Sequence, residues 1–201
     1  MFDLENAPVP VRPDIPEALR ASFRATARPG GVFTGAERVD IANTARTGEA
    51  GGVLSRFARH LYSEPATVEE EHVREAADRV GDPAVVETIG IVSRLSSVDR
   101  FHTVLGIPLE PLPEPEAGEP NGKINEGLKR RRGHVPMPPG PIPVALDLVS
   151  SEAEAFKAMF GPMYMTEEEM SDPDFGRSPG LDTPQLEIVA ARVSLINRCF
   201  Y

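Results

Sequence analysis

The sequence predicts an all-α protein, and three observations support this fold class. Apolar residues recur every three or four positions through successive segments of the chain. Residues that commonly begin or end helices flank most of these segments. No segment shows a sustained alternation of apolar and polar residues, which is the pattern of a half-buried strand.

The first predicted helix covers residues 14–27 and has Pro16 in its first turn, where a proline is tolerated. The second covers residues 34–45, and Thr34 and Glu37 have the spacing of a capping box. The third covers residues 49–62, where apolar residues again follow the helical period.

The fourth predicted helix covers residues 67–80, with Thr67 and Glu70 at capping-box spacing. The longest covers residues 82–106, opens on Asp82 and Pro83, and ends at Gly106. Its apolar stripe comprises Val85, Ile89, Val92, Leu95, Val98 and Leu105. His102 shares that face, and we expect it to pack in a core or an interface and not to bind a ligand.

Ten of the 21 prolines lie between Pro108 and Pro143, so neither a helix nor a central strand can run through this stretch. We expect residues 107–143 to form a linker, with the basic run at 129–132 as a solvated turn. Helices are predicted again over 144–164 and from Thr183 through Ile196. The predicted organisation is a helical domain at 1–106, the linker, and a second helical domain at 144–201.

The amino-acid composition argues against several classes of partner and of site. The 201 residues carry a formal net charge of −10, which argues against nucleic acid or an anionic membrane as the main partner. The single cysteine, Cys199, excludes an internal disulfide framework and a cysteine-cluster metal site within this sequence. His60, His72 and His134 show no metal-site spacing, and we expect neither a metal nor another cofactor. The absence of a targeting signal or a long apolar run predicts a cytoplasmic protein.

Two residues near the C-terminus are candidates for chemistry. Cys199 is the only thiol, although a free cysteine is also commonly a small buried hydrophobe. Glu187 lies in an apolar segment and could carry a proton, although a glutamate near a helix N-terminus also favours the helix dipole.

Residues 186–201 resemble the active-site segment of the carboxymuconolactone decarboxylase superfamily, in its alkylhydroperoxidase D-like branch. The pattern of that branch is a Glu, eleven residues, and then Cys-x-x-Cys-x-x-x-His. Glu187 and Cys199 match the Glu and the first Cys, and the sequence given stops at Tyr201, one position before the second Cys. Residues 101–115 look like the end of a superfamily domain, and residues 134–139 look like the start of a second copy. The whole is similar to double-domain members whose first copy is degenerate.

The resemblance implies a helical bundle of the alkylhydroperoxidase D-like kind and an antioxidant, peroxiredoxin-type thiol peroxidase. In family terms, a residue at position 202 attacks the peroxide, Cys199 resolves the oxidised product to a disulfide, and Glu187 belongs to the proton relay. The implied partners are a hydroperoxide substrate and a dithiol electron donor. We also expect a homo-oligomer, because the short second copy exposes the apolar side of its last helix.

Other interpretations stay open, and whether this chain is an enzyme is not decided by the sequence. The chain could be a catalytically inactive helical subunit, or a decarboxylase acting on a muconolactone-like acid, although Cys199 in its motif position counts against the latter. The superfamily includes members with selenocysteine in this motif. We therefore expect a selenocysteine, encoded by UGA, at position 202, with a frameshift, an assembly edge or a pseudogene as the alternatives.

The motif also makes a geometric demand. On an unbroken helix, residues 187 and 199 lie about 18 Å apart, at 1.5 Å per residue, and could not cooperate. The resemblance therefore requires a break near Asn197 and Arg198, with Asn197 able to cap the helix that follows.

Overall fold

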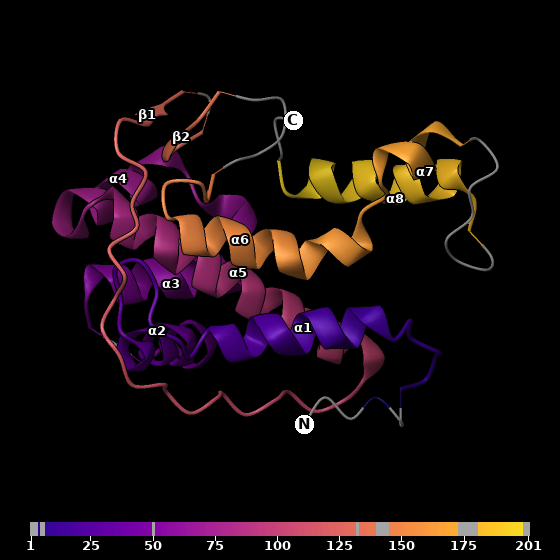
Figure 1. The fold of residues 1–201 in the computed structure, drawn as a ribbon, viewed down its shortest axis with the longest axis horizontal. Coiled ribbons are helices and arrows are strands. Elements are labelled where there is room, and N and C mark those ends of the chain that lie inside the picture. Colours follow the sequence, from indigo (N-terminus) through magenta and orange to yellow (C-terminus); the bar gives the residue numbers. More distant parts are fainter. Residues whose placement is uncertain are drawn as a thin grey trace.

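The computed structural model describes residues 4, 7–49, 51–131, 133–139, 145–172 and 181–198. Helices dominate this part of the chain, which confirms the all-α class (Figure 1). The helices are α1 (Asp14–Ala25), α2 (Gly35–Thr47), α3 (Val53–Ser63), α4 (Glu70–Val80), α5 (Asp82–Leu105), α6 (Ser150–Phe160), α7 (Glu167–Ser171) and α8 (Thr183–Ile196), with single 3-10 turns η1 (Pro65–Thr67) and η2 (Gly161–Met163). The strands β1 (Lys129–Arg130) and β2 (Pro136–Met137) form a two-residue antiparallel pair, a small exception to the expected absence of sheet.

Helix α5 is the centre of the bundle. It begins with Pro83 in its first turn and ends at Gly106, whose φ of 67° is the left-handed conformation that glycine adopts without strain. It contacts α1, α2, α3, α4 and α6, so side chains all around it are buried. One apolar cluster gathers around its second half with residues of α1 and α2, and another gathers around its first half with residues of α4 and of the segment 135–153.

Several predicted helix starts differ from the structure, and the helix expected from residue 144 begins at Ser150. The capping box of Thr34 and Glu37 is confirmed, because the Glu37 N–H donates to Thr34 Oγ1 over 3.3 Å. Thr67, predicted to cap the fourth helix, instead ends η1, where its hydroxyl donates to the Glu64 carbonyl over 2.9 Å. Helix α4 begins three residues later with Glu69 as its N-cap. Helix α3 begins at Val53 and not at residue 49, after Gly48 has ended α2 in the left-handed region.

The proline-rich segment lies on the bundle as an ordered strap. Residues 107–123 have no regular secondary structure, as predicted, but their backbone is hydrogen-bonded to the loop after α1. The N–H of Glu116 donates to the Ala27 carbonyl over 2.8 Å, and the N–H of Asn121 donates to the Gly30 carbonyl over 2.9 Å. Figure 1 shows this strap leaving the end of α5, passing below α1 and α2, and rising along the left side of the view to β1. The strap is part of the connection from α5 to α6, and α6 packs against α1 and α5.

Helices α6 and α8 have contrasting surroundings. Helix α6 packs against α1 and α5 and buries Glu152, Ala153 and Met159. Helix α8 buries none of its residues, and Figure 1 shows it beside α7 and extending away from the α1–α5 bundle. Its exposed apolar residues are Ile188, Val189, Val193, Leu195 and Ile196. None of the helices that the structure describes is long and apolar enough to cross a membrane.

Candidate functional site

The structure places one member of the predicted catalytic pair. Glu187 lies in α8, four residues after Thr183, and is exposed to solvent. Cys199 lies outside the described residues, so its approach to Glu187 stays a prediction. The cap of α8 is Asp182 and not Thr183, with the Gln185 N–H donating to Asp182 Oδ1 over 2.8 Å.

Helix α8 ends where the motif requires a break, and the returning helix that the motif also requires would lie outside the described residues. The helix ends at Ile196, and Asn197 follows as its C-cap. Arg198 has a φ of 52°, the left-handed region that a non-glycine residue seldom adopts. The helical path is therefore broken at Asn197 and Arg198, immediately before Cys199. The Arg198 guanidinium lies 3.0 Å from Glu69 Oε1, which ties this break to the N-terminus of α4.

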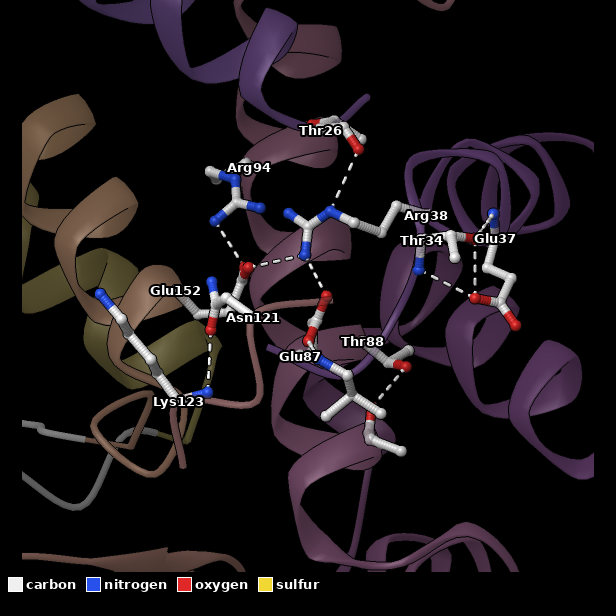
Figure 2. Close-up of polar contacts among 12 residues, drawn as sticks. Thr26, Thr34, Glu37, Arg38, Glu87, Thr88, Arg94, Asn121, Lys123 and Glu152 are labelled. Atoms are coloured by element: carbon white, nitrogen blue, oxygen red, sulfur yellow. Dashed lines mark hydrogen bonds and ion pairs between the residues drawn. The ribbon is translucent and has the colours of Figure 1, made fainter. Parts of the chain in front are cut away.

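A second constellation is buried inside the bundle. Arg38 of α2, Glu87 and Arg94 of α5, and Glu152 of α6 are each no more than 3% exposed. Figure 2 shows Arg38 between the two carboxylates, with Arg94 on the far side of Glu152. Nη1 of Arg38 lies 2.8 Å from Glu152 Oε1 and also contacts Glu87 Oε1, and Nη1 of Arg94 lies 2.6 Å from Glu152 Oε2. Two cations and two anions thus form one neutral buried network.

Backbone groups complete the network. The Val32 N–H donates to Glu87 Oε2 over 2.6 Å, and Arg38 Nε donates to the Thr26 carbonyl over 3.2 Å. The backbone partner in each bond, the Val32 N–H or the Thr26 carbonyl, belongs to the segment that follows α1, so the network joins that segment to three helices. Two glycines leave the necessary space: a Cβ at Gly30 would overlap Glu87 and Arg38, and a Cβ at Gly90 would overlap the Glu152 carboxylate.

Burial shifts the pKa values of Glu87 and Arg94 in opposite directions, in each case toward the uncharged form. Desolvation raises the pKa of the Glu87 carboxyl above its ordinary value, the nearby Arg38 guanidinium opposes this, and Glu152 reinforces it. Desolvation lowers the pKa of the Arg94 guanidinium, and the Glu152 carboxylate opposes that change. Arg94 meets Glu152 as an ion pair without hydrogen-bond alignment, and its Nε and Nη2 have no hydrogen-bond partner among the described residues.

A third cluster of polar side chains contacts the proline-rich strap. Arg46 of α2 makes a two-pronged contact with Asp99 of α5, at 2.9 and 2.6 Å, and its Nη1 donates to the Glu110 carbonyl over 2.9 Å. The Tyr62 hydroxyl donates to Asp99 Oδ2 over 2.7 Å, and burial together with this hydrogen bond raises the pKa of Tyr62 to about 12. His102 is 1% exposed and its Nδ1 lies 2.8 Å from the Val98 carbonyl, which confirms the core interpretation of this residue.

The sequence analysis missed the buried network, although it contained a signal. Glu87 follows Val85 and Val86 directly, and Arg94 precedes Leu95 within the same apolar helix. A charge amid apolar residues on a helix that is buried all around needs a partner of opposite sign. The sequence does not show which residue supplies it, because Arg38 and Glu152 lie on other helices.

The network is suited to hold elements together more than to carry out chemistry. None of its four side chains lines the surface pockets of about 340, 250 and 220 Å³ found among the described residues. No group of three or more His, Cys, Asp or Glu side chains suited to a metal ion occurs among the described residues.

Comparisons with family models, with curated proteins and with solved structures gave no match for this chain, so the resemblance of residues 186–201 stays a prediction.

Proposed function

We propose that this chain belongs to a thiol or selenol peroxidase of the alkylhydroperoxidase D-like branch of the carboxymuconolactone decarboxylase superfamily. The observation that carries the proposal is the end of α8 at Ile196, followed by the left-handed Arg198. A continuous helix would have kept Glu187 and Cys199 about 18 Å apart, and the break allows the chain to turn back after Arg198.

The proposed reaction uses two atoms one after the other: a sulfur or selenium atom at the second motif position, and then the sulfur of Cys199. A thiolate or selenolate at the second motif position, three residues beyond Cys199, attacks the O–O bond of a hydroperoxide. It becomes a sulfenic or selenenic acid, and the alkoxide leaves and takes up a proton. The Cys199 thiolate then displaces water and forms the disulfide or selenenylsulfide, which a dithiol donor reduces. Glu187 belongs to the relay that delivers the proton.

The α1–α6 bundle is the scaffold in this proposal. The buried charged side chains described in this bundle pair with one another. The one cysteine of the sequence given, at position 199, is not among the residues of α1–α6. This arrangement favours, for the bundle itself, the non-catalytic role that the sequence analysis left open. The bundle would then serve to present α8 and the segment that follows it.

The experiment is peroxide consumption by protein that extends through the second motif position, with a dithiol donor and a metal chelator present. The proposal predicts many turnovers per chain, lost when Cys199 is replaced by Ser and reduced in Glu187→Gln. The matched control is Glu168→Gln, which changes an exposed carboxylate on α7. Full activity in Cys199→Ser would overturn the assignment of Cys199.

A further inference from the structure

Asn121 and Gly122 form the single asparagine–glycine pair of the sequence, whose other four asparagines precede Ala, Thr, Glu and Arg. Both residues are exposed and lie where the strap meets the loop after α1. An asparagine followed by glycine is prone to lose its side-chain amide, because glycine has no Cβ to hinder a close approach of its main-chain nitrogen. The pair is therefore a candidate site of non-enzymatic modification.

The reaction at such a pair needs only water. The main-chain nitrogen of Gly122 gives up its proton and forms a bond to Cγ of Asn121. The bond from Cγ to the side-chain nitrogen breaks, and this nitrogen takes up the proton and leaves as ammonia. Water then opens the resulting cyclic imide, a succinimide, at one of its two carbonyl carbons. The product is either aspartate or isoaspartate, in which the main chain runs through the former side chain.

The docked strap blocks the nucleophile of this reaction. The Gly122 N–H donates to the Gly31 carbonyl over 3.1 Å, so the proton that must leave is held while the strap is docked. The Asn121 N–H donates to the Gly30 carbonyl over 2.9 Å, which fixes the backbone on the other side of the asparagine. The electrophile, in contrast, is prepared. The Lys123 N–H donates to Asn121 Oδ1 over 2.8 Å (Figure 2), and this bond draws electrons from Cγ. Attack therefore waits for the strap to open.

An isoaspartate at position 121 would not fit the docked strap. The donors of residues 121 and 122 face the carbonyls of two consecutive residues, 30 and 31. Isoaspartate inserts one extra main-chain carbon between these donors, so both can no longer meet consecutive carbonyls. The same stretch continues to Asn125, whose N–H donates to the Leu148 carbonyl over 2.9 Å just before α6. The modification would thus loosen the connection between the loop after α1 and the start of α6.

We propose that Asn121–Gly122 is a modification site guarded by the docked strap, and that its conversion to isoaspartate makes an opening of the strap irreversible. While the strap is docked, the side-chain amide is retained. When the strap opens, the Gly122 nitrogen is free to attack, and the isoaspartate product prevents the strap from docking again. The proposal does not depend on the proposed peroxidase function.

The test is the rate of amide loss at mildly alkaline pH in the whole chain, folded and in urea. Mass spectrometry follows the digest peptide that ends at Lys123. Loss at Asn121 should be about tenfold or more slower in the folded protein, because two backbone hydrogen bonds must open first. Equal rates in the two states would overturn the guarding role of the strap.

Two comparisons in urea test the assignment of the site. Asn125, which precedes Glu126, should keep its amide while Asn121 loses its own. Gly122→Ala should slow the loss at Asn121 about tenfold, because a Cβ hinders the attacking nitrogen. Loss at Asn125 as fast as at Asn121, or an unchanged rate in Gly122→Ala, would overturn the assignment.

Gly35→Ala tests the link to the strap in the folded protein. A Cβ at Gly35 would overlap the carbonyl oxygen of Glu116 in the strap, so the loss at Asn121 should become about threefold faster or more. The matched control is Gly51→Ala, where a Cβ meets no atom within 4 Å and the rate should not change. In purified isoaspartate protein, the Gly122 amide should lose about tenfold in protection from hydrogen exchange. Retained protection there would overturn the irreversible opening.

Discussion

Nη1 of Arg38 lies 2.8 Å from Oε1 of Glu152, across 114 positions of sequence. This contact joins α2, near the start of the bundle, to α6, which follows the proline-rich strap. Both side chains are almost fully buried, so water cannot compensate either charge if the other is lost. The docking of α6 therefore depends on the ion pairs of Glu152 as well as on apolar packing.

Glu152→Gln should destabilise the fold, because it leaves a buried net positive charge among Arg38, Arg94 and Glu87. We expect the free energy of unfolding in urea to fall by about 3 kcal/mol. Glu154→Gln, an exposed change on the same helix, should alter it by less than about 0.5 kcal/mol. Replacing Glu152 and Arg94 together by Met should cost less than the sum of the single changes, and additive losses would contradict the network.

Gly90→Ala tests the space that the network requires. Alanine in the middle of a helix is ordinarily favoured over glycine by about 1 kcal/mol. Here the added methyl group would overlap the Glu152 carboxylate, so we expect a net loss of about 1–3 kcal/mol in unfolding free energy. Gly161→Ala is the control, because a Cβ there meets no atom within 4 Å. A stabilised Gly90→Ala protein would show that α6 moves aside freely.

Tyr62 should ionise at unusually high pH. Its pKa of about 12 means that the folded protein retains a phenolic proton that the unfolded chain loses near its ordinary value of 10.0. The stability that Tyr62 contributes is present below about pH 10 and is lost as pH rises toward about 12. Ultraviolet titration should show a tyrosinate component near pH 12 that disappears in Tyr62→Phe. The component should move to lower pH in Asp99→Asn, which weakens the hydrogen bond.

The polypeptide of residues 1–201 should consume no hydroperoxide catalytically. Its one thiol, Cys199, is the resolving group in the proposed scheme and has no second chalcogen to act upon. Its rate in the presence of a dithiol donor should equal that of the same polypeptide with Cys199→Ser. Sustained turnover that depends on Cys199 would show that this thiol itself attacks the peroxide.

Removing residues 173–201 should leave the bundle nearly as stable as before. Helix α8 buries none of its residues, and the surface pair of Arg198 and Glu69 is worth less than about 1 kcal/mol. Urea unfolding of residues 1–172 should therefore give a free energy within about 1 kcal/mol of that of the longer chain. A large loss would mean that α8 packs on the bundle in solution.

The sequence could predict features that depend on near neighbours. The capping box of Thr34 and Glu37 and the proline start and glycine end of α5 are local signals, and both occur in the structure. The end of α8 at Ile196 is expected for another reason, because the resemblance requires a break there. Thr67 misled because it lies in η1, where its hydroxyl donates to the Glu64 carbonyl, and none of the backbone N–H groups described for α4 reaches it as a cap would require. Local rules do not contain that competition.

Features that depend on distant segments could not be predicted in the same way. The partners of Glu87 and Arg94 come from α2 and α6, and which helix faces which is set by tertiary packing. The edge-to-face contact between the ring of His60 in α3 and the ring of His72 in α4 likewise requires these helices to meet at one register. Neither the period of apolar residues nor the capping pattern specifies that register.

The order of synthesis gives the Arg38–Glu152 pair a consequence for folding on the ribosome. When Arg94 has been made, the nascent bundle holds two of its buried cations and only one of its buried anions, Glu87. Glu152 follows only after the strap, about 3 to 12 seconds later at 5–20 residues per second. A closed bundle of α1–α5 would carry an unpaired buried charge until then, so we expect its compaction to wait until α6 has been made. On this expectation, the length of the segment between α5 and α6, which includes the strap, sets that interval.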